Sequence, residues 1–93
     1  MAEPVPAEAD LVLDCRGMIC PLPIIELGRA WPSTVPGQLV DVISDDPAAA
    51  TDVAAWCRMR GQELVGQTAY KAGESGRPAT AYRIRHRPSD PAG

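Results

Sequence analysis

Phenylalanine is absent from this 93-residue sequence, and its only aromatic residues are two tryptophans and two tyrosines. The core must therefore be built from Val, Leu and Ile side chains together with Trp31 and Trp56. No apolar run approaches the roughly 20 residues of a membrane-spanning helix. The first ten residues, MAEPVPAEAD, also lack the basic and apolar regions of a secretory signal. These absences argue against a membrane protein, and we expect a cytoplasmic one.

Positive charge is also scarce. Nine Lys and Arg residues stand against 12 Asp and Glu residues, which gives a net charge of −3. Proteins that bind nucleic acid without sequence preference need a surplus of positive charge to displace counterions from the phosphates. We therefore expect no direct binding to nucleic acid, although a partner protein could still bring this protein into contact with RNA.

Cysteine and histidine are too few for several common kinds of site. The three cysteines are Cys15, Cys20 and Cys57, an odd number and too few for a secreted disulfide scaffold. Together with His86 they lack the closely spaced ligand pairs of structural zinc. The sequence shows no Gly-rich phosphate loop, paired catalytic carboxylates or nucleophile–base constellation. We expect no metal or cofactor, and the residues indicate no independent catalytic site.

A single domain is predicted over residues 10–87, between two tails. Residues 1–9 and 88–93 contain several Pro and Ala residues, show no periodicity, and are predicted to be disordered. Between them, hydrophobic periodicity and turn residues predict six elements. They are a strand at 10–14, a helix at 21–31, a strand at 38–44, a helix at 46–60, and strands at 62–69 and 79–87, with a turn at 71–77.

The element order β-α-β-α-β-β predicts an α+β fold, a two-layer α/β sandwich. Two helices cannot cover both faces of a four-stranded sheet, so we expect a mixed sheet with both helices on one face and water on the other. Asp46 and Pro47 are typical of an N-cap and a first helical position. Gly61 suits the position after the end of the same helix.

The last predicted strand alternates between two kinds of side chain. One face would carry Tyr82, Ile84 and His86, with His86 partly exposed near the strand end, and the other Arg83, Arg85 and Arg87. The arginines are interpreted as a solvated sheet edge that resists aggregation. The alternative is a docking patch for an acidic partner or RNA. Cys57, beside Trp56 on the apolar side of the second helix, is predicted to lie in the core.

Cys20 stands directly before Pro21 and Pro23, at the start of the first predicted helix. Proline is tolerated in a first helical turn, and its ring stiffens the chain there. The positive end of the helix dipole and its unpaired amides stabilise an anion. We therefore expect the pKa of Cys20 to be lowered, which favours the nucleophilic thiolate, with help from Arg16. The alternative is a small buried residue at a strand–helix corner.

The residues around Cys20 resemble the motif of the TusA/SirA-like sulfur carrier family. In that family a Cys-Pro-x-Pro motif opens the first helix of a small β-α-β-α-β-β sandwich. The likeness covers roughly residues 11–87 and includes the Asp-Asp-Pro stretch at 45–47, the Trp56-Cys57 segment and the alternating last strand. The motif residues are Leu13, Asp14, Gly17, Cys20, Pro21 and Pro23.

This resemblance implies a persulfide carrier. Cys20 would accept sulfane sulfur from a cysteine desulfurase or rhodanese-type donor and pass it to an acceptor protein of a sulfur relay. The relay could serve tRNA thiolation, cofactor biosynthesis or sulfur oxidation. Pro21 and Pro23 would be structural, Gly17 would permit a close turn, and Asp14 would fix the loop or guide the donor. A carrier that docks two partners in turn is expected to be a monomer.

Two residues depart from the family pattern and leave alternatives open. Cys15 is either a small residue that ends the first strand or a resolving thiol that attacks a persulfide or sulfenic acid on Cys20. Ile19 replaces the basic or polar residue that many relatives carry before the cysteine, so the partners can differ. The alternative functions are a thiol–disulfide redox protein that uses Cys15 and Cys20, and a partner-binding module without chemistry at Cys20.

Overall fold

The structure, a computed structural model, describes residues 8–88. The predicted tails, 1–9 and 88–93, lie outside the described residues except for residues 8, 9 and 88. The elements follow the predicted order. The strands are β1 (Leu11–Asp14), β2 (Leu39–Ser44), β3 (Glu63–Tyr70) and β4 (Ala79–Arg85). The helices are α1 (Leu22–Ala30) and α2 (Ala49–Arg60), with a short 3-10 turn, η1 (Trp31–Ser33), after α1.

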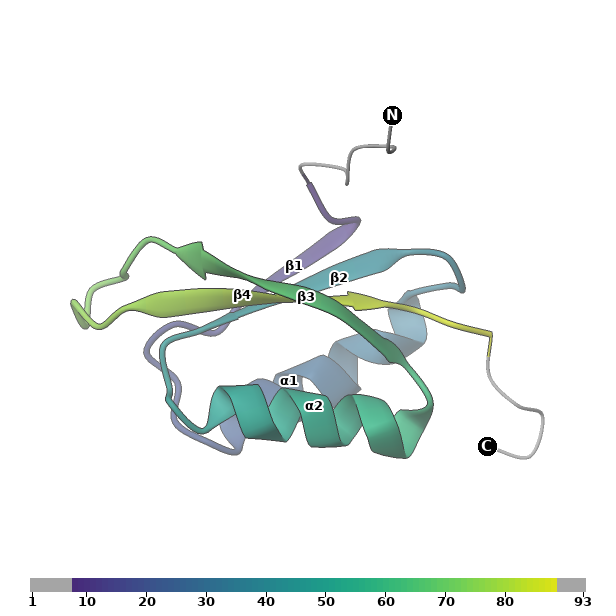
Figure 1. Ribbon diagram of the computed structural model, residues 1–93, viewed down its shortest axis with the longest axis horizontal. Coiled ribbons are helices and arrows are strands. Elements are labelled where there is room, and N and C mark those ends of the chain that lie inside the picture. Colours follow the sequence, from purple (N-terminus) through teal and green to yellow (C-terminus); the bar gives the residue numbers. More distant parts are fainter. Residues whose placement is uncertain (1–7, 89–93) are drawn as a thin grey trace.

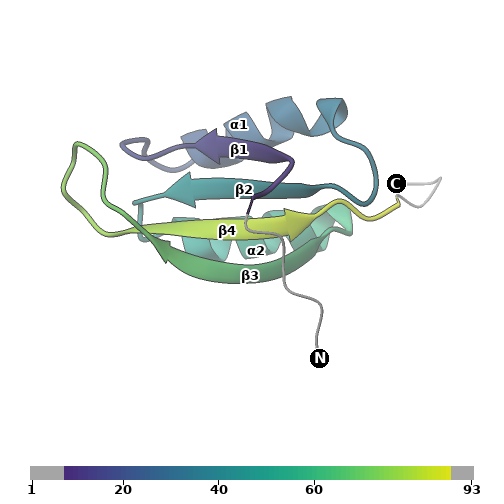
Figure 2. The ribbon, with the colours of Figure 1, turned by 90° about the horizontal axis from the view of Figure 1, so that it is seen from above.

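The four strands form one mixed sheet in the order β1-β2-β4-β3. β1 and β2 are parallel, whereas β4 is antiparallel to both β2 and β3. Both helices cover the same face of the sheet (Figure 1). Seen from above, the strands lie in front of the two helices (Figure 2). The predicted α+β two-layer sandwich is confirmed.

The core lies between the sheet and the helices and is built from branched aliphatic side chains and both tryptophans. Trp31 and Trp56 meet edge to face with ring centroids 4.9 Å apart. Burying rings of this size supplies much of the apolar surface that a chain without phenylalanine would otherwise lack. Cys57 lies in this core as predicted. The other buried members are Cys15, Leu27, Val40, Val42, Ala49, Val53, Tyr82 and Ile84.

His86 is buried, so the prediction of a partly exposed residue is wrong. Only 8% of it is exposed, because its ring stacks on Trp31 at a centroid distance of 4.5 Å. The hydroxyl of Thr34 donates to the carbonyl of Trp31 over 2.7 Å, and it lies 2.6 Å from Nδ1 of His86. Since that hydroxyl has one proton, Nδ1 must be the donor in this second bond. Burial lowers the pKa of His86.

The arginines of β4 do not form a sheet edge, because β4 is paired on both sides. Arg83 makes a 2.8 Å ion pair with Asp41, and Arg85 lies 3.6 Å from Glu63. Beside them on the open face, Ile43 packs with two alanines of β4, Ala79 and Ala81, in a small apolar cluster. The open face is therefore not fully solvated. β4 is not an edge strand, so that part of the interpretation is wrong, whereas Arg85 and Arg87 are exposed to solvent as it expects.

The helices begin slightly later than predicted. α2 starts at Ala49, because Asp46 and Pro47 form a turn in which a side-chain oxygen of Asp46 accepts the N–H of Ala48 over 2.9 Å. α1 starts at Leu22 with Pro21 at its N-cap. Gly61 ends α2 in a left-handed conformation with φ of +68°, as its position predicted.

Candidate functional site

Cys20 lies in the loop that joins β1 to α1. The loop leaves the sheet at Cys15, which is 1% exposed, turns at Gly17 with φ of +87°, and reaches the surface at Cys20. Pro21 is exposed and Pro23 is buried, so the second proline anchors the start of α1 against the protein. The peptide bond between Cys20 and Pro21 is cis. The loop therefore presents the sulfur of Cys20 from an anchored segment.

Asp14 fixes the first half of this loop through Arg16. The guanidinium group of Arg16 binds both carboxylate oxygens of Asp14, at 2.9 and 2.7 Å, and also donates to the carbonyl of Lys71 over 3.0 Å. This ion pair lowers the pKa of Asp14. The prediction that Arg16 helps to activate Cys20 is wrong, because the charged groups that act on the thiol are Asp52 and Asp46.

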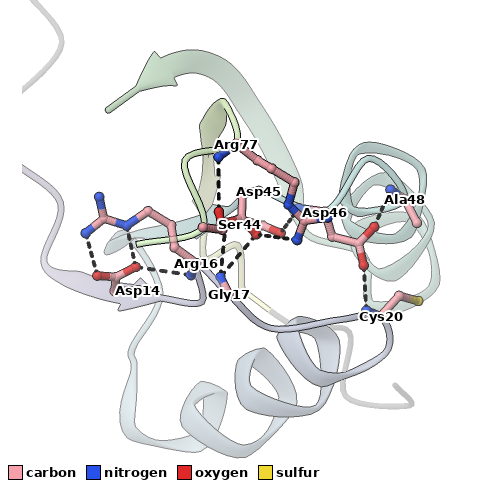
Figure 3. A network of polar contacts seen from close by, with 10 residues as sticks. Asp14, Arg16, Gly17, Cys20, Ser44, Asp45, Asp46, Ala48 and Arg77 are labelled. Atoms are coloured by element: carbon pink, nitrogen blue, oxygen red, sulfur yellow. Dashed lines mark hydrogen bonds and ion pairs between the residues drawn. The ribbon is translucent and has the colours of Figure 1, made fainter. Parts of the chain in front are cut away.

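Asp45 joins the loop to the hairpin between β3 and β4. Its side chain is fully buried and accepts the N–H of Gly17 over 3.1 Å and the hydroxyl of Ser75 over 2.6 Å. Arg77 completes the cluster at 3.3 Å (Figure 3). The hydroxyl of Ser75 and the amide of Gly17 are the main causes of the lowered pKa of Asp45. Gly17 thus supplies both the turn and a backbone donor.

Asp46 holds the backbone of Cys20. One oxygen of its carboxylate accepts the N–H of Cys20 over 2.7 Å, and the other accepts the N–H of Ala48 over 2.9 Å (Figure 3). The amide of Ala48, followed by that of Cys20, lowers the pKa of Asp46. A single carboxylate therefore ties Cys20 to the segment that leads into α2.

The thiol of Cys20 donates a hydrogen bond to Asp52 in the first turn of α2, with 2.6 Å between Sγ and Oδ2. This bond, together with desolvation and the charges of Asp52 and Asp46, raises the pKa of Cys20. The prediction of a lowered pKa is therefore wrong for the resting thiol. A carboxylate next to a thiol favours the protonated form because two negative charges repel each other.

The start of α1 offers little that could lower the pKa of the Cys20 thiol again. The N–H of Leu22 is already bonded to the carbonyl of Ile19 at 2.9 Å, and that of Ile24 to the carbonyl of Pro21 at 3.1 Å. Proline has no N–H, so Pro21 and Pro23 cannot donate at all. The amides that usually stabilise an anion at a helix start are therefore paired or absent here.

Exposed apolar side chains lie beside Cys20. Ile19 is 68% exposed, and Leu22 and Ile25 are also exposed. Leu22 and Ile25 are three residues apart on α1 and therefore lie on the same face of the helix. We call Ile19, Leu22 and Ile25 the apolar collar. Unpartnered apolar groups of this kind often mark a surface where another protein binds.

The other cysteines are in a different environment from Cys20. Burial is the main cause that raises the pKa of Cys15 to about 11 and that of Cys57 to about 11. Within residues 8–88, no cluster of three or more His, Cys, Asp or Glu side chains could hold a metal ion. In the same part of the chain, no helix is long and apolar enough to cross a membrane.

Sequence reasoning finds Cys20, Asp14 and Gly17 but misses the contacts that hold them. In the sequence, Asp45 and Asp46 stand out only as part of a family-like stretch and as a helix cap. Asp52 does not stand out at all. The only signal for Asp52 in the sequence is an acidic residue near a helix start, which by itself indicates no more than a favourable charge near the helix dipole.

Comparison with known proteins gives consistent results. The sulfur carrier protein TusA of Pseudomonas syringae pv. tomato is 36% identical over 70 residues, which cover 74% of this chain and 83% of that protein. The sulfur carrier protein TusA of Pseudomonas aeruginosa (strain UCBPP-PA14) is 38% identical over 58 residues, covering 62% and 73%.

A solved structure with a similar fold and a family sequence pattern point to the same family as these relatives. The crystal structure of a SirA-like protein from Desulfitobacterium hafniense superposes with a TM-score of 0.62 at 18% identity, covering 84% of this chain and 99% of that one. The sequence pattern of the family described as Sulfurtransferase TusA matches residues 11–75, a stretch that includes Cys20 and all of its polar contacts. This chain therefore belongs to the TusA family.

Proposed function

We propose that this protein is a sulfur carrier that holds sulfane sulfur as a persulfide on Cys20. It takes the sulfur from a cysteine desulfurase or rhodanese-type donor and passes it to an acceptor protein. The observation that carries the proposal is the exposed sulfur of Cys20 on a loop held by Asp45 and Asp46. Membership of the TusA family and the names of the relatives support it.

The transfer step needs only sulfur exchange. Sγ of Cys20 attacks the terminal sulfur of the donor's persulfide anion, and the bond between the donor's two sulfurs breaks. The thiol proton of Cys20 goes to the departing sulfur of the donor, which leaves as a thiol. Cys20 then carries the persulfide anion, and there is no net oxidation or reduction. Delivery repeats the same exchange with a cysteine of the acceptor.

The surroundings of Cys20 suit exchange with another protein. Sγ of Cys20 must come within bonding distance of the transferred sulfur while that sulfur is still bound to the donor's cysteine, so the partner must cover the residues beside Cys20. The apolar collar gives such a partner a surface to bury, because exposed apolar patches commonly mark sites where another protein binds. Asp46 keeps the backbone of Cys20 in place during the approach.

The relay is expected to operate in the cytoplasm, where thiols stay reduced. Because one surface must serve donor and acceptor in turn, we expect the carrier to be a monomer. The acceptor belongs to a relay for tRNA thiolation, cofactor biosynthesis or sulfur oxidation, and the carrier itself does not bind nucleic acid. Cys15 is buried and its pKa is raised to about 11, which favours a core role over that of a resolving thiol.

Intact mass spectrometry tests the proposal. The wild-type protein is incubated with a cysteine desulfurase and cysteine, or with a rhodanese and thiosulfate, and its mass is recorded with and without reductant. We expect a gain of one sulfur atom that reductant reverses. Cys20→Ser should abolish the gain, whereas the control Cys15→Ser should retain it. No gain with either donor, or a gain that survives Cys20→Ser, contradicts the proposal.

A further inference from the structure

The resting thiol of Cys20 has a specific acceptor. Its Sγ lies 2.6 Å from Oδ2 of Asp52, a half-buried residue in the first turn of α2. The backbone of Cys20 is held separately, by the 2.7 Å bond from its N–H to Asp46. Backbone and side chain therefore have different carboxylate partners, so the sulfur can leave Asp52 while the loop stays in place.

The bond to Asp52 depends on the proton of the thiol. A carboxylate only accepts hydrogen bonds, and the thiol S–H is a donor. A persulfide is more acidic than a thiol and is mostly anionic at neutral pH, so it has no proton to donate. Two anions in contact repel each other. The contact therefore stabilises the empty carrier and disfavours the same position for the loaded one.

We propose that Asp52 is a positioning residue that holds the sulfur of empty Cys20 against α2 and releases it outward once the sulfur is loaded. The inference rests on the proposed function. It adds that the contact between Cys20 and Asp52 differs between the empty carrier and the loaded carrier. In the empty state the bond limits thiolate formation and so protects Cys20 from stray oxidation. In the loaded state the repulsion turns the terminal sulfur toward the acceptor.

Neighbouring charges do not provide an alternative acceptor for the proton. The charged groups that act on the thiol are Asp52 from α2 and Asp46 from the β2–α2 loop. Both oxygens of Asp46 already accept backbone N–H groups, one of Cys20 and one of Ala48. Asp46 therefore stays on the backbone in both states, and only the bond to Asp52 changes with loading.

The first test follows the alkylation rate of Cys20 by iodoacetamide as a function of pH, with the adduct located by mass spectrometry. We expect Asp52→Asn to move the profile to lower pH and Asp52→Glu to restore it at least in part. If the profile moves by one pH unit, the fraction of Cys20 present as thiolate at neutral pH rises about tenfold. The nucleophilicity of that thiolate falls about threefold, because it falls with the pKa. The alkylation rate at neutral pH should therefore rise about threefold.

A matched control removes a carboxylate that does not touch the thiol. Glu26 on α1 is partly exposed and is not among the groups that act on Cys20. Glu26→Gln changes the net charge by the same amount as Asp52→Asn and should leave the profile unmoved. Equal displacement of the profile in both variants, or none in Asp52→Asn, overturns the proposal. Thermal unfolding of each variant confirms that the fold is retained.

The second test measures sulfur handover. Wild type and Asp52→Asn are loaded equally, and the rate at which each loses sulfur to a small thiol and to an acceptor protein is followed by mass. We expect handover from Asp52→Asn to be several-fold slower, because the repulsion is lost. An unchanged or faster handover overturns the release step. Failure of wild type to gain any sulfur instead overturns the proposed function, and the alkylation profile still decides whether Asp52 holds the resting thiol.

Discussion

At the scale of single residues, the environment of Cys20 matters more than its position at a helix start. The sequence placed Cys20 correctly, because a cysteine before a Pro-x-Pro segment is a strong local signal. It predicted the wrong direction for the pKa of Cys20, because the deciding group, Asp52, lies 32 positions away in the sequence. Contacts of this kind depend on how α1 and α2 pack together, which no local pattern reveals.

Gly17 provides the clearest stability prediction at this scale. At φ of +87° an alanine would be strained, although no heavy atom of the described residues lies within 4 Å of an added Cβ. Gly17→Ala should therefore lower the free energy of unfolding by about 1–2 kcal/mol, a purely backbone effect. Urea denaturation measures it.

The control for Gly17 is the same substitution in a helix. Gly28 lies within α1 and likewise has open space around an added Cβ among the described residues. Because alanine is the better helix former by about 1 kcal/mol, Gly28→Ala should stabilise the protein. A loss of stability in both variants would show that the cost at position 17 does not come from the positive φ.

At the scale of elements, the site is an assembly of four segments, one of which is the first turn of α2 with Asp52. The β1–α1 loop supplies Cys20, the β2–α2 segment supplies Asp45 and Asp46, and the β3–β4 hairpin supplies Arg77 (Figure 3). The same hairpin also supplies Ser75. Hydrophobic periodicity predicted each helix and strand to within a few residues. It did not predict that β4 lies between β2 and β3, because strand order depends on packing across the whole sheet. For this reason the role of the hairpin could not be foreseen.

The pH dependence of stability tests the link between these segments. The pKa of Asp45 is lowered in the folded state, so its ionised form stabilises the fold. This stabilisation is complete above the unfolded pKa, about 3.9, and is lost as the pH falls toward the folded pKa. Asp45→Asn should therefore melt at a lower temperature at pH 7, and its further drop in melting temperature between pH 7 and pH 3 should be smaller than that of wild type.

Ser75→Ala is the matched control for this measurement, because it keeps the carboxylate and removes the largest cause of the lowered pKa. The decrease in the melting temperature of Ser75→Ala between pH 7 and pH 3 should lie between those of wild type and Asp45→Asn. The drop that remains in Asp45→Asn is expected from Asp14 and Asp46, whose pKa values are also lowered. An undiminished drop in Asp45→Asn would mean that Asp45 does not couple the segments through its charge.

At the scale of the whole molecule, the groups that matter for sulfur transfer gather at one end of the helical layer. Cys20 contacts the first turn of α2, and the apolar collar lies beside it at the start of α1. The last turn of α2, with Met59, lies about 10 Å farther along the helix axis. A partner that reaches Cys20 therefore covers the collar and leaves the far end of α2 free.

This arrangement predicts that partner binding at the apolar collar can be impaired more than the reactivity of the Cys20 sulfur. Leu22→Asp places a charge in the collar and should slow protein-to-protein sulfur transfer about fivefold to tenfold, which corresponds to roughly 1–1.4 kcal/mol of lost partner binding. Loading of Cys20 by inorganic polysulfide, which needs no docking surface, should fall by less than protein-to-protein transfer, because only the new charge near the thiol acts on it. Met59→Asp introduces the same charge at a side chain that is 81% exposed, and it should affect neither rate.

If Leu22→Asp and Met59→Asp slow transfer equally, the effect is one of net charge and the collar is not the docking surface. If polysulfide loading falls in Leu22→Asp by the same factor as protein-to-protein transfer, the substitution acts on Cys20 itself and not on docking.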